Sequence, residues 1–243
     1  MFIFEVEMAY VVELRAGLPV ESKQTKEVKP CWPSSEFSSS YEKHIVDSTI
    51  GVHENGFEGN AAGFPSHIED TLNRAILVYN ESTYIDLKIL FPLAALTLIR
   101  GGFGENIVIN HPSLLASEVC VGDKFSIGTT ICQVTGPRAP CPKVDGWHAV
   151  KGLTQHCKEY GCAGYFMRVL QEGQISTGDE FILRERLYPG YTIERISQGL
   201  WGKEDARDDS EAFLSALAGM PELIGRHYRE TANTRLQRIL DKE

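Results

Sequence analysis

The sequence has 243 residues, of which 42% are hydrophobic, so the chain can bury the core of one large domain or of a medium domain with a smaller one. Its 24 basic and 33 acidic residues give a formal net charge of −9. This charge argues against broad binding to the phosphate backbone of nucleic acids, which needs a basic face, but it leaves room for a small anionic ligand held by a few basic side chains.

No stretch of the sequence predicts export or a membrane span. Residues 1–7 lack the basic start and the uninterrupted apolar core of a signal peptide, and the longest apolar run, Ile89 to Ile99, contains Pro92 and is too short to cross a bilayer. The cysteines include no CxxC pair; they are Cys31, Cys120, Cys132, Cys141, Cys157 and Cys162. We therefore expect a reduced cytoplasmic protein without a disulfide framework or a structural zinc site, and with neither a membrane nor a nucleic acid as its partner.

The first 43 residues predict one strand and one irregular segment. Residues 5–14 alternate in hydrophobicity and are followed by Gly17 and Pro19, so we expect a strand that belongs to the barrel of the next domain. Residues 21–43 are polar and rich in Ser, Lys and Pro, which is typical of a mobile loop or an insertion.

Residues 44–188 predict a β domain. Short alternating or β-branched runs indicate strands, which we expect over 44–52, 75–79, 107–109, 124–128, 129–135, 165–170 and 180–187. Two helices interrupt them, one from Glu81 to Leu90 and one from Leu153 to Tyr160, which ends at Gly161. Many short strands with turn signals between them favour a mainly β fold with a closed, barrel-like sheet.

After Pro189 the pattern changes to three helices. Thr192 can cap a helix over 193–199, and Asp209 or Ser210 can cap a second over 211–218, while a third covers 222–240. A segment of about 50 residues is too small to be confidently stable alone. We therefore expect residues 189–243 to pack on the β domain or on a second subunit, as in a homodimer.

One cysteine lies in a stiff loop just past a predicted strand. Pro140 and Pro142 flank Cys141, and because proline fixes its own φ and restricts the residue before it, this backbone is rigid. Arg138 and Lys143 would favour the thiolate, which is the form of cysteine that attacks electrophiles and binds metals. The alternative is a proline-rich connector in which Cys141 is an incidental small apolar residue.

Several segments, in this order, resemble the MOSC family, the domain related to the C-terminal part of molybdenum cofactor sulfurases. Residues 54–60 are similar to its Gly-Leu-x-Gly-Asp turn, with Asn60 in place of the acid, and 104–107 (Gly-Glu-Asn-Ile) resemble its Gly-Glu-Asn-Leu turn. Residues 138–141 match its Arg-x-Pro-Cys loop, and 164–179 resemble the strand pair that closes the domain. The helical tail resembles the subfamily that includes bacterial hydroxylaminopurine-resistance proteins.

The resemblance implies a molybdenum cofactor, a pterin (molybdopterin) that carries a phosphate and a dithiolene-bound metal. It implies Cys141 as the metal ligand or sulfur carrier, since a soft thiolate suits such a metal. The expected reaction is the two-electron reduction of a small N-hydroxylated substrate such as a hydroxylaminopurine. Electrons would come from a separate reductase, because the sequence contains no Rossmann glycine fingerprint and no ferredoxin-like cysteine cluster. Pyridoxal phosphate binding is a further association at the family level only.

Basic residues are the expected contacts of the cofactor. Arg138 and Lys143 could hold the pterin phosphate, the alternative being ordinary surface charge. Arg74 and Arg168 are each either an anion contact or one half of an ion pair, with Glu105 or Asp179 as partner.

Glu105 and Asn106 are further expected cofactor contacts, unless they only build their turn through hydrogen bonds to the backbone. His67 is a candidate proton donor. It opens the segment 67–75, which corresponds to the family's His-Gly-Gly-x-x-(Lys/Arg)-Ala but is two residues longer and lacks the glycines.

Two other classes of function stay open. The chain could be a sulfur carrier or cofactor-delivery module in which Cys141 bears a persulfide. It could also be a binding protein that keeps the barrel without the metal, and the altered segment 67–75 favours that reading because glycines there would let backbone approach a ligand closely.

Overall fold

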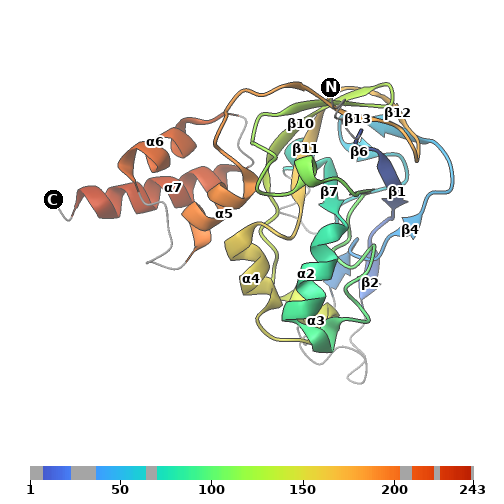
Figure 1. Cartoon of the computed structure of the whole chain (residues 1–243), viewed down its shortest axis with the longest axis horizontal. Helices are drawn as coiled ribbons and strands as arrows, with labels where there is room; N and C mark the ends of the chain where they lie inside the picture. Colours follow the sequence, from blue (N-terminus) through green and yellow to red (C-terminus); the bar gives the residue numbers. More distant parts are fainter. Residues whose placement is uncertain (1–7, 23–36, 64–69, 203–209, 222–224, 242–243) are drawn as a thin grey trace, which may run out of the picture.

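The fold is built on one mixed eight-stranded sheet (Figure 1). The computed structural model describes residues 8–22, 37–63, 70–202, 210–221 and 225–241. The strand order of the sheet is β13 (Phe181–Glu185), β9 (Lys124–Ile127), β10 (Thr130–Pro137), β11 (Tyr165–Gln171), β7 (Ile76–Asn80), β8 (Ile107–Ile109), β1 (Val11–Ala16) and β4 (His44–Ile45). Neighbouring strands are antiparallel except β7 and β8, which are parallel.

The sheet is an open half-barrel, which corrects the closed barrel predicted from the sequence. An isolated bridge between Tyr10 and Glu180 joins the segment before β1 to the start of β13. Backbone hydrogen bonds of Ala9 and Val11 with residues 178–181 accompany it, so the two sides meet over a short stretch without forming a paired strand. The chain is 32% helical and 27% strand, so the prediction of a mainly β fold holds only in part. One reason is the parallel β7–β8 pair, because parallel strands need a long crossover, and here it contains α2 (Ser82–Leu90) and η2 (Pro92–Ala94).

Two small sheets lie beside the main one. One contains β12 (Gly173–Ile175), β5 (Ile50–His53) and β6 (Gly56–Phe57), and the other pairs β2 (Val20–Ser22) with β3 (Phe37–Ser39). The second pair corrects the prediction of a loop over 21–43, although residues 23–36 lie outside the described part of the chain. The strand predicted over 5–14 is found in part, as β1, which begins later, at Val11, and ends at Ala16; residues 5–7 lie outside the described part of the chain.

The predicted helices are present, and two of their predicted caps are confirmed. They are α2, α4 (Leu153–Tyr160), α5 (Ile193–Trp201), α6 (Glu211–Gly219) and α7 (Gly225–Leu240). The Thr192 side chain accepts a hydrogen bond from the backbone N–H of Arg195, and the Ser210 side chain accepts one from Phe213. The sequence did not predict α3 (Lys143–Trp147), nor the short 3₁₀ turns η1 (Thr71–Arg74) and η3 (Pro112–Leu114). None of the helices described is long and apolar enough to cross a membrane.

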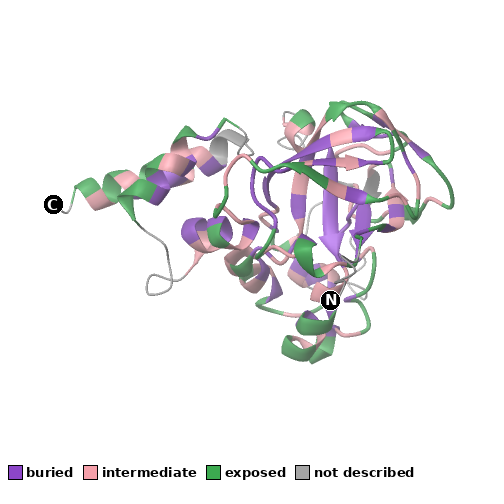
Figure 2. Cartoon of the chain, turned by 45° about the horizontal axis from the view of Figure 1, so that its top comes forward, coloured by how far each residue is buried: buried purple, intermediate pink, exposed green. Residues whose placement is uncertain are grey.

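Three buried clusters hold the molecule together (Figure 2). The first fills the concave side of the sheet, with Val78, Ile107, Val134 and Met167 among its fully buried members. The second lies between α2, α4 and the turn that contains Phe103. The third joins the C-terminal helices to the β domain, because Ile196, Leu217 and Tyr228 of the helices pack with Val121, Phe166 and Tyr188.

The C-terminal helices extend to one side of the sheet (Figure 1). One of their side chains nevertheless contacts the loop that follows β10. The Tyr228 hydroxyl on α7 donates a hydrogen bond of 2.9 Å to the carbonyl of Pro137 and accepts one of 3.1 Å from the N–H of Ala139. Tyr228 is 1% exposed, so water does not replace these bonds. The helical segment therefore fixes the start of that loop.

Tyr228→Phe tests this contact. The change leaves a carbonyl and an N–H without their shared partner, and an unsatisfied buried polar group costs about 1–3 kcal/mol. We expect the urea midpoint to fall with an unchanged m-value. The control is Tyr160→Phe, whose side chain is 45% exposed and which should unfold like the wild type. Equal midpoints for the two variants would contradict the bracing role of Tyr228.

Candidate functional site

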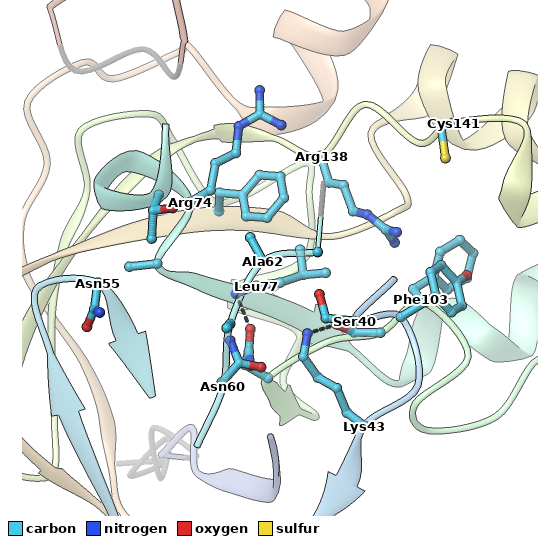
Figure 3. A pocket seen from close by; sticks show the side chains of 18 of the residues that line it. Ser40, Lys43, Asn55, Asn60, Ala62, Arg74, Leu77, Phe103, Arg138 and Cys141 are labelled. Atoms are coloured by element: carbon cyan, nitrogen blue, oxygen red, sulfur yellow. Dashed lines mark hydrogen bonds between the residues drawn. The ribbon is translucent and has the colours of Figure 1, made fainter. Parts of the chain in front are cut away.

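A cavity of about 260 Å³ opens where several distant segments of the chain meet (Figure 3). Its walls come from the segment before β4, the turn after β6, η1, the glycine-rich turn before β8, the loop between β10 and α3, and β11. The lining residues that carry polar or aromatic side chains are Ser40, Tyr41, Lys43, Asn55, Asn60, Thr71, Arg74, Phe103, Asn106, Arg138, Cys141, Lys143 and Phe166. Such a concave site with converging polar groups is the usual form of a ligand site.

The charges around the cavity are all positive among the described lining residues. Lys43, Arg74, Arg138 and Lys143 line it, whereas none of the lining side chains described is a carboxylate. The whole chain, in contrast, carries a net charge of −9. A concave surface lined by cations in an acidic protein is suited to an anionic ligand.

Arg138 is the most enclosed of these cations. Its guanidinium lies 5.4 Å from the centre of the Tyr41 ring and 5.8 Å from that of Phe103. Its Nη1 atom is buried and has no hydrogen-bond partner among the described residues. A buried donor without a partner is costly, and a ligand oxygen placed at Nη1 would remove that cost.

Lys43 shares this part of the cavity. Its Nζ donates a 2.7 Å hydrogen bond to the carbonyl of Gly104. Burial, with a further contribution from the positive charge of Arg138, lowers the pKa of Lys43 to about 8. The Tyr41 hydroxyl donates to the carbonyl of Gly102 at 2.6 Å, and burial raises its pKa. Lys43 can therefore exchange a proton near neutral pH, whereas Tyr41 stays protonated.

Gly104 permits this close arrangement. Its φ of +68° is in the left-handed region, and a Cβ at this position would come within 2.7 Å of the Tyr41 carbonyl oxygen. A side chain at residue 104 would therefore clash with the backbone of the segment that carries Lys43.

Cys141 lies on this cavity, as predicted, in the loop between β10 and α3, with its side chain exposed to solvent. Figure 3 shows it beside Arg138. Its carbonyl accepts hydrogen bonds from the Val144 N–H at 3.0 Å and from the Thr154 Oγ1 at 3.4 Å. Thr154 belongs to α4, so α4 contacts the loop in addition to Tyr228 of α7. The loop follows the end of a strand, as predicted, and helix contacts position it in addition to the prolines.

Asn106 and Asn60 are hydrogen-bonded to one another in the wall of the cavity. The Asn106 Oδ1 accepts from the Leu77 N–H at 3.1 Å, and its Nδ2 donates to the carbonyl of Arg15 and to the Asn60 Oδ1. The Asn60 Oδ1 also accepts from the Gly17 N–H at 3.3 Å. Both side chains line the cavity, so Asn106 keeps its predicted place while building its turn. Asn60 acts here as an acceptor, and a carboxylate oxygen would accept the same bonds.

Glu105 and Arg168 do not line the cavity. Glu105 is fully buried and accepts hydrogen bonds from the Tyr84 hydroxyl and from the N–H groups of Gly101 and Phe103, which corresponds to the turn-building alternative. Arg168 lies on β11 two residues beyond Phe166, which is roughly 7 Å further along the strand. Neither residue is therefore among the described residues that line the cavity, and a cofactor contact by either stays a prediction.

Arg74 lines the cavity, and its partner differs from the two suggested by the sequence. Its Nε lies 3.2 Å from the Asp70 Oδ2, four residues earlier, and its guanidinium lies 5.5 Å from the centre of the Phe166 ring. His67, the predicted proton donor, falls outside the described residues.

Sequence reasoning missed Tyr41, Lys43 and Asn55, which also line the cavity. Tyr41 and Lys43 lie in the polar segment 21–43, which the sequence predicts as a loop. No hydrophobic periodicity in that segment indicates which side chains face a cavity. The turn 54–60 contained the only available signal for Asn55, because its Asn-Gly step predicts a tight turn.

Comparison with known proteins agrees with this architecture. Protein YiiM of Escherichia coli (strain K12) is 26% identical over 178 residues, which are 73% of this chain and 78% of that protein. Its crystal structure superposes with a TM-score of 0.71 at 22% identity, covering 96% of this chain and 94% of that one. The YiiM structure from Geobacillus stearothermophilus gives a TM-score of 0.68 at 25% identity, covering 94% of this chain and 99% of that one.

Two other relatives match the chain over a smaller part of their own length. YflK of Bacillus subtilis (strain 168), described as uncharacterized, is 28% identical over 153 residues, which are 63% of this chain and 66% of that protein. A protein named "Reductase" from Gibberella moniliformis (strain M3125 / FGSC 7600) is 29% identical over 187 residues, which are 76% of this chain but only 32% of that longer protein.

The family itself follows from the central part of the sequence. A family model for the MOSC domain matches residues 59–182, about half of the chain, and this range contains Arg74, Asn106, Arg138, Cys141 and Lys143. MOSC domains are associated, at the family level, with binding of the molybdenum cofactor. With its half-barrel, its YiiM-like fold and its cationic cavity beside an exposed cysteine, this chain belongs to the MOSC domain family.

Proposed function

We propose that the cavity binds the molybdenum cofactor and that the protein uses it to reduce N-hydroxylated substrates. The observation that carries the proposal is the set of four cationic side chains around a cavity without a carboxylate among its described lining residues. The pterin phosphate is an anion of the kind that such a site attracts. The buried Nη1 of Arg138, which lacks a partner among the described residues, is a donor that a phosphate oxygen would satisfy.

The donor set also fits the metal end of the cofactor. Cys141 provides a sulfur on an exposed loop next to the cavity, and thiolates bind soft metals. Arg74 and Lys143 lie on the same cavity and can hold anionic groups, Lys143 as a point charge and Arg74 through the guanidinium face not used by Asp70. When bound, the cofactor supplies two-electron redox chemistry at molybdenum.

The residues of the chain have three tasks in this mechanism. Cys141 fixes the metal end, the cationic side chains hold the pterin, and Lys43 holds a proton on Nζ at the cavity wall. The overall reaction consumes two electrons and two protons for each N–O bond broken, giving an amine and water. Lys43 takes the proton-donor role that the sequence suggested for His67.

The electrons would come from a separate reductase. The Gibberella relative supports this, because the part matched here is 32% of a protein whose name is "Reductase". No cluster of three or more His, Cys, Asp or Glu side chains that could hold another metal is found among the residues described. A homodimer remains our proposal for the assembly.

A second candidate function is a sulfur carrier. The exposure of Cys141 favours it, because a persulfide on an exposed loop can be reached by another protein. Mass spectrometry that preserves persulfides separates the two functions: an intact persulfide on Cys141 without turnover of an N-hydroxylated substrate supports the carrier.

Cys141→Ala tests the main proposal. The wild type, made in a host that synthesises the cofactor, should contain molybdenum by elemental analysis and reduce a hydroxylaminopurine when a reductase is supplied. The variant should lose reduction by on the order of 100-fold, since it lacks a ligand of the metal. The matched control is Cys132→Ala, a buried cysteine on β10 that does not line the cavity. Unchanged molybdenum content and unchanged reduction in the Cys141 variant would rule out its role.

Arg138→Gln tests the anion site separately from the metal. Loss of a hydrogen bond to a charged group costs about 1.5–3 kcal/mol, so we expect the pterin to be retained roughly 10–100-fold more weakly. Fluorescence of the extracted, oxidised pterin measures this. The control is Arg184→Gln, an exposed arginine on β13 outside the cavity, which should keep the wild-type pterin content. Equal pterin content in both variants contradicts the assignment of Arg138.

The pH dependence of the reaction tests Lys43. Because its pKa is lowered to about 8, Nζ carries a proton below that pH and loses it above, so reduction per bound molybdenum should fall as the pH rises through 8. Lys43→Arg should move this fall to higher pH. Lys124→Arg should leave it in place, because Lys124 lies on β9 outside the cavity and pairs with Glu185.

A measurement without the cofactor keeps this test independent of turnover. The rate at which an amine-reactive reagent labels Lys43 in the apo-protein should rise with a midpoint near pH 8, against about 10.4 for the lysine of a model peptide. A midpoint for Lys43 at the model-peptide value would exclude it as the proton donor.

A further inference from the structure

The crossover between β7 and β8 contains the longest apolar run of the sequence, and it is apolar on two faces. One face belongs to the buried cluster around Phe103, to which Tyr84, Leu87, Ala94 and Leu98 contribute. The other face is open to solvent. Its large apolar side chains, which we call the crossover patch, are Ile85, Ile89, Leu90, Leu93, Leu96 and Ile99. A helical segment that is apolar all round normally has both faces covered.

The crossover patch is continuous along the backbone. Ile85 and Ile89 are one turn apart on α2, so their side chains lie on the same side of this helix. Leu93, Leu96 and Ile99 follow at three-residue spacing through η2 and the hydrogen-bonded turns after it. In tight turns of this kind, side chains three residues apart lie above one another. The exposed side chains therefore form one surface.

The crossover patch is large for the surface of a monomer. The exposed fractions run from 54% for Ile99 to 91% for Leu96, and together they equal about four fully exposed leucine-sized residues. This is roughly 700 Å² of apolar surface, against about 300–600 Å² for the largest patch of a typical monomer. It is close to the roughly 800 Å² that each partner buries in a stable interface of standard size. The area is therefore what a protein interface needs.

The charges around the patch favour an apolar protein surface over a lipid surface. Among the exposed positions from 85 to 99, only Asp86 carries a charge. At the edge, the Arg100 Nε lies 2.5 Å from the Glu81 Oε2, so this cation is already paired. A segment that binds a membrane surface is rich in Lys and Arg on its polar side, which this crossover is not. A two-fold axis would bring an equally apolar surface from a second copy, without placing many like charges together.

The C-terminal helices are the other surface that the sequence suggested for a second subunit. Their apolar side chains, among them Ile196, Leu217 and Tyr228, are buried against the β domain of the same chain. Figure 1 shows α6 and α7 well apart from α2, so these helices leave the crossover patch uncovered.

We propose that the crossover patch is the interface of a symmetric homodimer, in which the patch of one copy packs on the same patch of a second copy. This assigns a surface to the homodimer proposed above, and it does not depend on a bound cofactor.

The interface is connected to the wall of the cavity through hydrogen bonds. The Thr97 Oγ1 on the crossover is hydrogen-bonded to the His148 Nδ1 at 2.8 Å. The His148 Nε2 donates to the carbonyl of Gly102 at 2.9 Å, and this carbonyl also accepts from the Tyr41 hydroxyl. The crossover that the second copy holds in place therefore also positions the turn that lines the cavity.

Sedimentation equilibrium of the reduced full-length protein tests the interface. The wild type should sediment with twice the chain mass of 27.1 kDa. Leu93→Lys and Leu96→Lys should each weaken the dimer by about 10–100-fold, because each removes a leucine from the interface and places a charge there. Both side chains are highly exposed in the single chain, so the fold should tolerate the changes. The matched control is Leu183→Lys, an exposed leucine on β13, which should dimerise like the wild type.

Three results would overturn the proposal. The first is a wild type that stays monomeric up to about 100 μM, well above the dissociation constants of stable dimers. The second is a dimer that both patch variants leave as stable as the Leu183 control does. The third is a monomer that floats with vesicles of phosphatidylcholine and phosphatidylglycerol, because this would assign the patch to a membrane.

Hydrogen exchange of the unmodified chain gives a test that does not depend on how the variants fold. Backbone amides within 85–99 should exchange more slowly at high than at low protein concentration, because dimerisation depends on concentration. Amides of β13 should exchange equally at both concentrations. Exchange within 85–99 that is independent of concentration contradicts the interface. Neither measurement involves molybdenum or turnover, so failure here leaves the proposed function of the cavity intact.

Discussion

Positive charge gathered around a cavity with no carboxylate among its described lining side chains is the constraint on which the site depends. Taking a cation out of water is costly unless it is paired, and this cost lowers the pKa of Lys43. Arg138 cannot relieve the cost by losing its proton, and its Nη1 lacks a hydrogen-bond partner among the described residues. Keeping two such groups together therefore costs stability while no anion is present. An anion that enters the cavity lowers this cost, which couples ligand binding to the stability of the walls.

The sheet makes this enclosure by joining segments that are distant in sequence. Asn106 connects the backbone at Leu77, at Arg15 and, through Asn60, at Gly17, so one side chain fixes the relation of β7, β1 and the turn after β6. Glu105 is fully buried and fixes its own turn by accepting hydrogen bonds from the backbone N–H groups of Gly101 and Phe103. Neither residue needs to touch a ligand to be required at the site. Their hydrogen bonds place Gly104 against Lys43, where the two backbones approach most closely.

Local patterns predicted the parts of this structure that depend on local physics. The caps at Thr192 and Ser210, the helix end at Gly161 and the stiff loop around Cys141 all follow from the preferences of single residues. The open sheet was not predictable in this way, because closure depends on how residues 9–11 and 178–181, which are distant in sequence, meet beside the Tyr10–Glu180 bridge.

The site residues that the sequence did not predict correctly are likewise those whose place depends on distant parts of the chain. Lys43 escaped prediction because it becomes part of the cavity only through the position of Gly104, 61 residues later. Arg168 was placed in the site because it adjoins an apolar run, but a strand advances roughly 7 Å in two residues, which is enough to carry it past the cavity that Phe166 lines.

The loop that carries Cys141 shows why the helical tail matters to a site it does not line. The MOSC match ends at residue 182, yet Tyr228 on α7 holds Pro137 and Ala139 at the start of the loop. From the other side, α4 contributes Thr154, which donates to the carbonyl of Cys141. Prolines alone restrict the shape of a loop but do not fix where it lies on the molecule. The position of the thiol over the cavity is therefore set by contacts from two helices, α4 and α7, in addition to the prolines.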